Sequence, residues 1–140
     1  MKQVIVMNRN NAKRYSYSEH NETCAIISIT DVWSNNNVFQ KNPKNGIQRV
    51  HHVKFDDVNR GGENCITEEQ ANAIAKFVKE VVDKVDIILV HCEAGQSRSA
   101  GCAAAILKWA TGSDLQIYDD PKYTPNSTVY SMVLCALYND

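Results

Sequence analysis

The chain has 140 residues, of which 44% are hydrophobic and 22% are charged, so it is long enough for one compact domain with its own core and short for two. Fifteen basic and sixteen acidic residues leave a formal charge of -1. This balance argues against a protein whose main task is to neutralise nucleic acid or an anionic membrane surface, and we expect it to bind neither.

Cysteine usage and the N-terminal residues both indicate a reducing, intracellular setting. The apolar run at residues 4–7 is too short for a signal peptide, and no stretch approaches the roughly eighteen apolar residues of a membrane span. The cysteines are odd in number and irregularly spaced, which excludes a disulfide scaffold and a Cys-x2-Cys pair: Cys24, Cys65, Cys92, Cys102 and Cys135. We therefore expect a cytoplasmic protein.

Taken in chain order, short runs rich in Val and Ile predict the strands. They occupy residues 4–7, 25–29 and 87–90, and their unbroken apolar character is typical of strands buried on both faces of a parallel sheet. A further, more alternating run covers residues 50–55.

A polar, Asn-rich stretch at residues 34–46, which contains Pro43, predicts a surface loop before the alternating strand. Two roles stay open for it. Together with Trp33 and Phe39 it forms one wall of a binding pocket, or it is a disordered surface loop and Trp33 packs on the core.

Three helices are expected in the second half of the chain. The first runs from the capping box at Thr67-Glu68-Glu69-Gln70 to residue 82. The second, residues 100–110, is apolar on every side, and the last begins at Pro125-Asn126. Because a crossover helix between two strands makes them parallel, we predict an α/β fold with a small, mainly parallel central sheet of about four to five strands flanked by helices.

The loop at residues 91–99 lies between the most buried predicted strand and the most buried predicted helix. It follows the carboxyl end of the strand, which is where binding and catalytic residues of open parallel sheets are found. Cys92 stands at its electropositive start, where the thiolate is stabilised and can act as a nucleophile. Arg98 has a planar fork that can hold two oxygens of a tetrahedral oxyanion. Backbone N–H groups that wrap before a helix bind the same anion, and those residues are Glu93, Ala94, Gly95, Gln96 and Ser97. The loop therefore predicts phosphoryl transfer to cysteine.

The residues that flank this loop fit the same chemistry. Ser99 is expected to hydrogen-bond the sulfur and improve it as a leaving group when water cleaves the cysteinyl-phosphate intermediate. His91 is expected to hold the conformation of the loop and favour the thiolate without entering the chemistry. We expect no cofactor and no metal, since adjacent His51 and His52 face opposite sides of a strand and their spacing to Cys92 supports no closed coordination.

The pattern His91-Cys92-x5-Arg98-Ser99 resembles the signature of the Cys-based protein tyrosine phosphatase superfamily. The short chain is similar to the small dual-specificity and bacterial or phage branches, and the resemblance covers roughly residues 24–137. It implies a single catalytic phosphatase domain over residues 1–140, with the Cys-x5-Arg phosphate-binding loop between a central strand and a helix.

The mechanism also needs a general acid that protonates the leaving oxygen and then acts as a base on the attacking water. In the superfamily this is an Asp on a mobile loop upstream of the cysteine, so the resemblance implies Asp57, which lies 35 residues before Cys92. Asp56 is the alternative, because neighbouring side chains on an extended segment point in opposite directions and only one can face the pocket. Asp31 is a weaker candidate and is expected to bond neighbouring backbone at a strand end.

The favoured substrate is a phosphorylated protein or peptide. Glu93 and Gln96 stand inside the loop where phosphoinositide phosphatases tend to carry lysines, and the short chain implies a shallow pocket open to phosphotyrosine, phosphoserine and phosphothreonine. Two alternatives stay open: a catalytically retired module that binds phosphorylated partners, and a phosphatase for a non-protein ester such as a phosphoinositide. A monomer is favoured.

Overall fold

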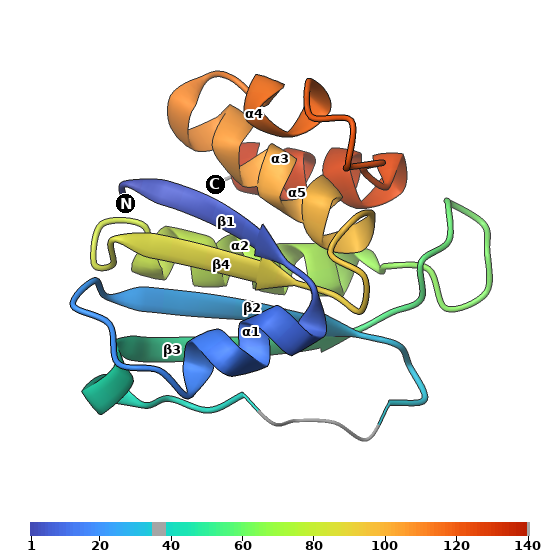
Figure 1. Cartoon of the computed structure of the whole chain (residues 1–140). Helices are drawn as coiled ribbons and strands as arrows, with labels where there is room; N and C mark the ends of the chain where they lie inside the picture. The colour runs from blue at the N-terminus through green and yellow to red at the C-terminus, as the bar shows by residue number, and fades with distance from the viewer. Residues whose placement is uncertain (35–38, 140) are drawn as a thin grey trace.

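The structure, a computed structural model, describes residues 1–34 and 39–139. In this part of the chain, four parallel strands form one sheet in the order β1-β4-β2-β3. The strands are β1 (Gln3–Met7), β2 (Cys24–Thr30), β3 (Ile47–Lys54) and β4 (Ile87–His91). Because the strands are parallel, their carboxyl ends all lie on the same side of the molecule (Figure 1). The predicted α/β fold with a small parallel sheet is confirmed.

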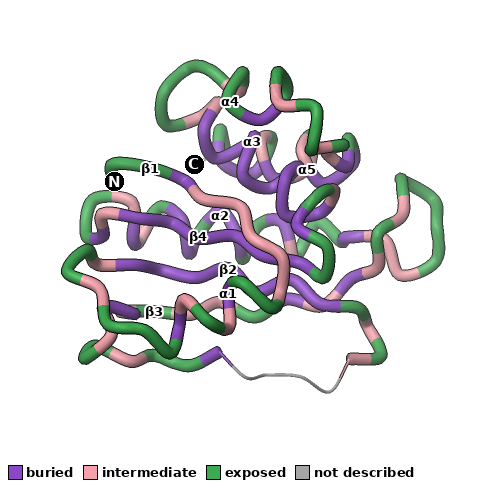
Figure 2. Tube along the Cα trace, viewed as in Figure 1, coloured by how far each residue is buried: buried purple, intermediate pink, exposed green. Residues whose placement is uncertain are grey.

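Burial separates the central strands from the edge strands. Every residue of β2 and β4 is buried, as their unbroken apolar runs predict. β1 lies at an edge of the sheet and most of its residues are only half-buried, but its side chains pack on the core at both faces, Val4 and Val6 at one face and Ile5 and Met7 at the other. The other edge strand, β3, starts at Ile47 rather than at residue 50. Figure 2 shows this contrast along the chain.

Helices cover both faces of the sheet. The helix α1 (Arg9–Ser16) packs on one face, and α2 (Glu68–Val81), α3 (Arg98–Thr111) and α5 (Ser127–Tyr138) form the core with the other (Figure 1). A short helix α4 (Leu115–Tyr118) follows α3, and a 3-10 turn η1 (Pro43–Asn45) precedes β3. None of the described helices has the length and apolarity of a membrane span.

The capping chemistry explains where the helices begin. The predicted capping box is present at α2: the Thr67 side chain accepts from the Gln70 N–H at 3.1 Å, and the Gln70 side chain accepts from the Thr67 N–H at 3.0 Å. Asn126 caps α5. The hydrophobic pattern does not predict α1, because Ala12 and Ser16 are its only buried residues and the other side chains of this eight-residue helix are polar or partly exposed.

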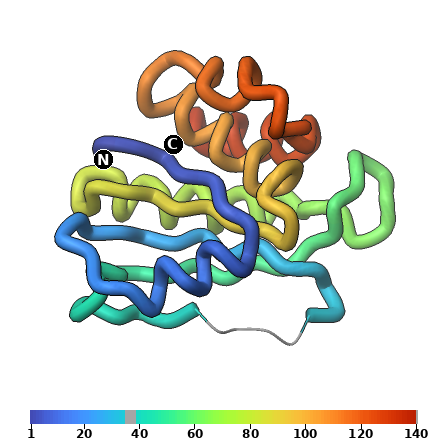
Figure 3. Tube along the Cα trace, in the orientation of Figure 1, coloured from blue at the N-terminus to red at the C-terminus, as the bar shows by residue number. Residues whose placement is uncertain are grey.

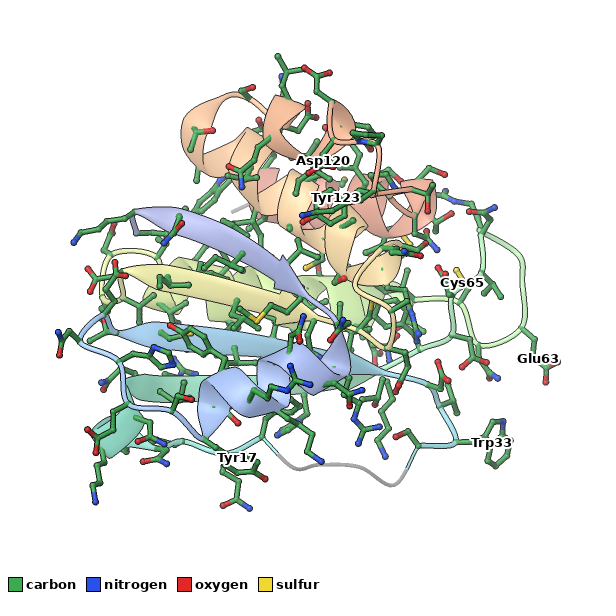
Figure 4. The ribbon with its side chains drawn as sticks, viewed as in Figure 1. Tyr17, Trp33, Glu63, Cys65, Asp120 and Tyr123 are labelled. Atoms are coloured by element: carbon green, nitrogen blue, oxygen red, sulfur yellow. The ribbon has the colours of Figure 1, made fainter. Side chains whose placement is uncertain are left out.

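The two aromatic residues around the Asn-rich stretch differ in burial. Phe39 is 2% exposed and its ring lies 4.4 Å from that of His91, so it belongs to the core between the sheet and α1 and not to a pocket wall. Trp33 is 85% exposed and points away from the body of the molecule (Figure 4), so it does not pack on the core. Residues 35–38 of this stretch lie outside the described residues.

Candidate active site

Residues 92–97 join β4 to α3 and are called the cysteine loop below. Cys92 follows β4 directly and is 3% exposed. Its Sγ lies 2.9 Å from Ser99 Oγ, and the backbone N–H of Gly95 donates to it at 3.3 Å. A thiolate accepts both of these hydrogen bonds, so the loop surrounds the sulfur with donors.

Residues 7–9, between β1 and α1, pack against the cysteine loop. Gly95 has a φ of 69°, and a Cβ atom there would lie 2.6 Å from the Asn8 nitrogen, so neither the backbone conformation nor the space admits a side chain. The N–H of Arg9 donates to the carbonyl oxygen of Glu93 at 3.2 Å. Figure 3 shows this turn between β1 and α1 beside the cysteine loop. The sequence motifs contain no signal for this contact.

His91, the last residue of β4, is fully buried below the loop. Its Nδ1 lies 3.3 Å from the carbonyl oxygen of Cys92, which can only accept, and its Nε2 lies 2.7 Å from Ser28 Oγ. Nδ1 therefore carries the proton and Nε2 accepts from the serine hydroxyl. Burial lowers the pKa of His91 from 6.5 to about 4. The imidazole is neutral at pH 7, so it brings no positive charge to the loop, and its hydrogen bond orients the Cys92 carbonyl.

Arg98, the first residue of α3, extends to two other strand ends. Its side chain is 6% exposed. Its Nη1 donates to Asp31 Oδ1 at 2.7 Å and to the carbonyl oxygen of Phe55 at 2.8 Å. Its Nε is buried and has no hydrogen-bond partner within the described residues. Asp31, expected to bond neighbouring backbone, thus directs its carboxylate to Arg98.

The two neighbouring aspartates of the loop between β3 and α2 point in different directions. Asp57 Oδ1 accepts from the hydroxyl of Ser97 at 2.8 Å, so this carboxylate lies against the cysteine loop. Asp56 accepts instead from the Val32 N–H at 3.1 Å and from the Asn64 amide at 3.0 Å. These hydrogen bonds, that of Asn64 first, lower the pKa of Asp56. Of the two, Asp57 is the carboxylate that contacts the loop of Cys92.

Asn126 joins the start of α5 to both loops. Its Nδ2 donates to Asp57 Oδ1 at 2.9 Å and to the Val58 carbonyl oxygen at 3.1 Å, while its Oδ1 accepts from the backbone N–H groups of Thr128 and Val129 in the first turn of α5. Its own N–H donates to the carbonyl oxygen of Ser97 at 3.0 Å. A hollow of about 340 Å³ borders Asp57, Ser97 and Asn126. The sequence predicts Asn126 as a helix start but carries no signal for its contact with Asp57.

The histidines of β3 lie apart from this constellation. His51 stacks on Phe77 with ring centroids 5.3 Å apart, whereas His52 Nε2 lies 2.9 Å from the Phe39 carbonyl oxygen. The two rings therefore face opposite sides of the sheet. Among residues 1–34 and 39–139, no group of three or more His, Cys, Asp or Glu residues is arranged to hold a metal ion.

No family model and no curated protein matches the sequence. The fold is similar to that of the Cydia pomonella PTP-2 phosphatase, with a TM-score of 0.64 and 15% identity over 96% of this chain and 86% of that one. Human DUSP28 has a TM-score of 0.58 and 14% identity, over 96% of this chain and 90% of that one. PTPMT1 in complex with PI(5)P has a TM-score of 0.55 and 14% identity, with the same coverage. The protein therefore has the same fold as these solved phosphatases.

Proposed function

We propose that the protein is a cysteine-dependent phosphatase that hydrolyses phosphate monoesters of phosphorylated proteins through a cysteinyl-phosphate intermediate. The observation that supports this most is that Asp57, from the loop between β3 and α2, lies against the loop that carries Cys92 and leads into Arg98. Cys92 lies inside the loop, Arg98 begins the helix that follows it, and Asp57 contacts it through Ser97. The likeness of the fold to solved phosphatases supports the same reaction class.

In the first step the Cys92 thiolate attacks phosphorus in line with the leaving oxygen. The S–P bond forms as the P–O bond breaks, and Asp57, in its acid form, transfers its proton to the leaving oxygen. The equatorial oxygens carry the charge of the transferring group, and we assign their stabilisation to the backbone N–H groups of the cysteine loop and to Arg98.

In the second step water hydrolyses the cysteinyl phosphate. Asp57, now a carboxylate, takes a proton from the attacking water, and the S–P bond breaks to release phosphate and the thiolate. The hydroxyl of Ser99, 2.9 Å from the sulfur, donates to the departing thiolate and improves it as a leaving group. His91 takes part in neither step and keeps the Cys92 carbonyl oriented.

A phosphoinositide is the second candidate substrate, because one similar fold was solved in complex with PI(5)P. The charges around the cysteine loop favour a phosphoprotein. Glu93 adds a carboxylate to the loop, and Arg9, the cation beside it, is paired with this carboxylate at 3.4 Å. An additional phosphate on an inositol ring would meet the Glu93 carboxylate, which already holds Nη1 of Arg9.

The test compares wild-type protein with Cys92→Ser on p-nitrophenyl phosphate, a phosphotyrosine peptide, a phosphothreonine peptide and PI(5)P. We expect turnover by the wild type that vanadate inhibits, no turnover by Cys92→Ser, and faster reaction with the peptides than with PI(5)P. Cys92→Ser should still bind phosphate, because the backbone donors remain. A wild type that binds phosphate without turnover would support a retired binding module, and a preference for PI(5)P would reassign the substrate.

A further inference from the structure

The proposed reaction assigns no role to the two hydrogen bonds that Arg98 donates to the strand ends. Asp31 follows β2 and Phe55 follows β3, and both accept hydrogen bonds from the same nitrogen, Arg98 Nη1, at 2.7 and 2.8 Å. A guanidinium Nη group has two hydrogens, so these two acceptors use both of them. Two strand ends therefore hold one corner of the Arg98 guanidinium.

The donors that remain for an anion are those on Nε and Nη2. These two nitrogens form one edge of the planar guanidinium, and that edge matches two oxygens of a phosphate. The Arg98 Nε is buried and has no partner within the part of the chain that the structure describes. A buried donor without an acceptor costs free energy, so an anion that supplies the acceptor removes this cost.

We propose that Asp31 is a positioning residue, which holds Nη1 of Arg98 so that the Nε–Nη2 edge stays directed at the phosphate bound over Cys92. This inference rests on the proposed function. The exposures of the pair fit the role, since the Arg98 side chain is 6% exposed and that of Asp31 is 52% exposed. Asp31 thus supplies the compensating charge from the surface while the arginine lies inside. A guanidinium oriented before substrate binds need not reorganise during the reaction.

The opposite role for this contact is competition, in which the Asp31 carboxylate and the phosphate bind Arg98 in turn. Substitution of Asp31 distinguishes positioning, which predicts weaker phosphate binding in the variants, from competition, which predicts tighter binding. Asp31→Asn keeps an oxygen acceptor without its charge, whereas Asp31→Ala removes the acceptor. We expect kcat/KM for p-nitrophenyl phosphate to fall about 10- to 100-fold in Asp31→Ala and by less in Asp31→Asn. In a Cys92→Ser background, calorimetric titration with inorganic phosphate should give a dissociation constant that rises most in Asp31→Ala and less in Asp31→Asn.

Asp86→Asn is the matched control. Asp86 also accepts hydrogen bonds from its surroundings, those of the Thr23 N–H and hydroxyl, but at the opposite end of the sheet. The Asp86→Asn variant should keep the wild-type kcat/KM and phosphate affinity. Thermal unfolding of every variant distinguishes a loss of stability from a loss of positioning. Unchanged or tighter phosphate binding in the Asp31 variants would overturn the inference. If wild type binds phosphate without turnover, the proposed function fails, and the titration still decides the role of Asp31; if wild type binds no phosphate, both fail.

Discussion

The two loops that meet at the candidate site are held in different ways. In the cysteine loop and the first turn of α3, Cys92, Gly95, Arg98 and Ser99 are buried, and residues 7–9 pack beneath them. In the loop between β3 and α2, residues 56–64 are all exposed or half-buried, and hydrogen bonds join it to its neighbours through Asp56, Asp57, Val58 and Arg60. Figure 4 shows Glu63 of this loop at the outer margin of the molecule.

This difference suits the two tasks that we propose. A site that stabilises developing charge gains from donors fixed before the reaction, and buried packing supplies that rigidity. A group that gives and later takes a proton gains from a loop that can adjust, and few buried contacts allow such movement. The comparison predicts that substitutions in the exposed loop change proton transfer, whereas substitutions in the cysteine loop change stability and charge stabilisation together.

The largest expected effect is that of Asp57→Asn on substrates with poor leaving groups. Because general acid catalysis contributes about 10²- to 10⁴-fold, kcat/KM for a phosphothreonine peptide should fall by that factor. The loss on p-nitrophenyl phosphate should be much smaller, since p-nitrophenolate leaves without a proton. Steady-state rates on both substrates measure the difference.

Asp56→Asn is the companion variant for this prediction. Its hydrogen bonds go to Val32 and Asn64, so it should keep the wild-type ratio between the two substrates. If Asp56→Asn changed that ratio and Asp57→Asn did not, our assignment of the acid would be reversed.

The second prediction concerns His91 below the cysteine loop. Its folded-state pKa is about 4 and its ordinary value is 6.5, so between these pH values the unfolded chain binds more protons than the folded one. The stability that the neutral ring contributes is present above pH 6.5 and is lost as the pH falls to 4, by about 3 kcal/mol. Urea unfolding at pH 7 and pH 4 should show this loss in wild type and a smaller one in His91→Asn.

His91→Asn also distinguishes the two loops. The hydrogen bonds that lower the pKa of Asp56 stabilise the protein fully above the ordinary carboxyl value of 3.8, and this stability is lost only as the pH falls from 3.8 through the lower folded-state pKa. An equal pH dependence in wild type and His91→Asn would show that the buried ring is not the source.

The smallest expected effect is that of Gly61→Ala, which is compared with Gly95→Ala because both glycines have a positive φ and one lies in each loop. Gly61 has a φ of 87° and no described heavy atom within 4 Å of an added Cβ, so Gly61→Ala should cost about 1 kcal/mol of stability and little activity. Gly95→Ala adds a clash with the Asn8 nitrogen, which displaces the cysteine loop and should lower kcat/KM about 10²-fold. Equal loss of activity in the two variants would contradict the proposed difference in rigidity.

Much of the fold could be predicted because its signals are local. Unbroken Val and Ile runs identify β2 and β4, and capping chemistry marks the starts of α2 and α5. The helix α1 could not be predicted, since its eight residues expose most of their polar side chains and the hydrophobic pattern is weak. It is stabilised instead by burial of Ala12 against the sheet, which is a tertiary contact.

The sequence by itself determined the order along the chain of the four strands and of the helices α2, α3 and α5. It also determined the grouping of Cys92, Arg98 and Ser99, because a loop of this length between a strand and a helix brings its own residues together. Tertiary structure alone decided which aspartate contacts that loop, since Asp56 and Asp57 differ only in the partners that other segments supply. It also decided that Asp31 meets Arg98 and that His91 is neutral. These properties depend on contacts between residues far apart in the chain and on burial, which exists only once the sheet and helices have packed.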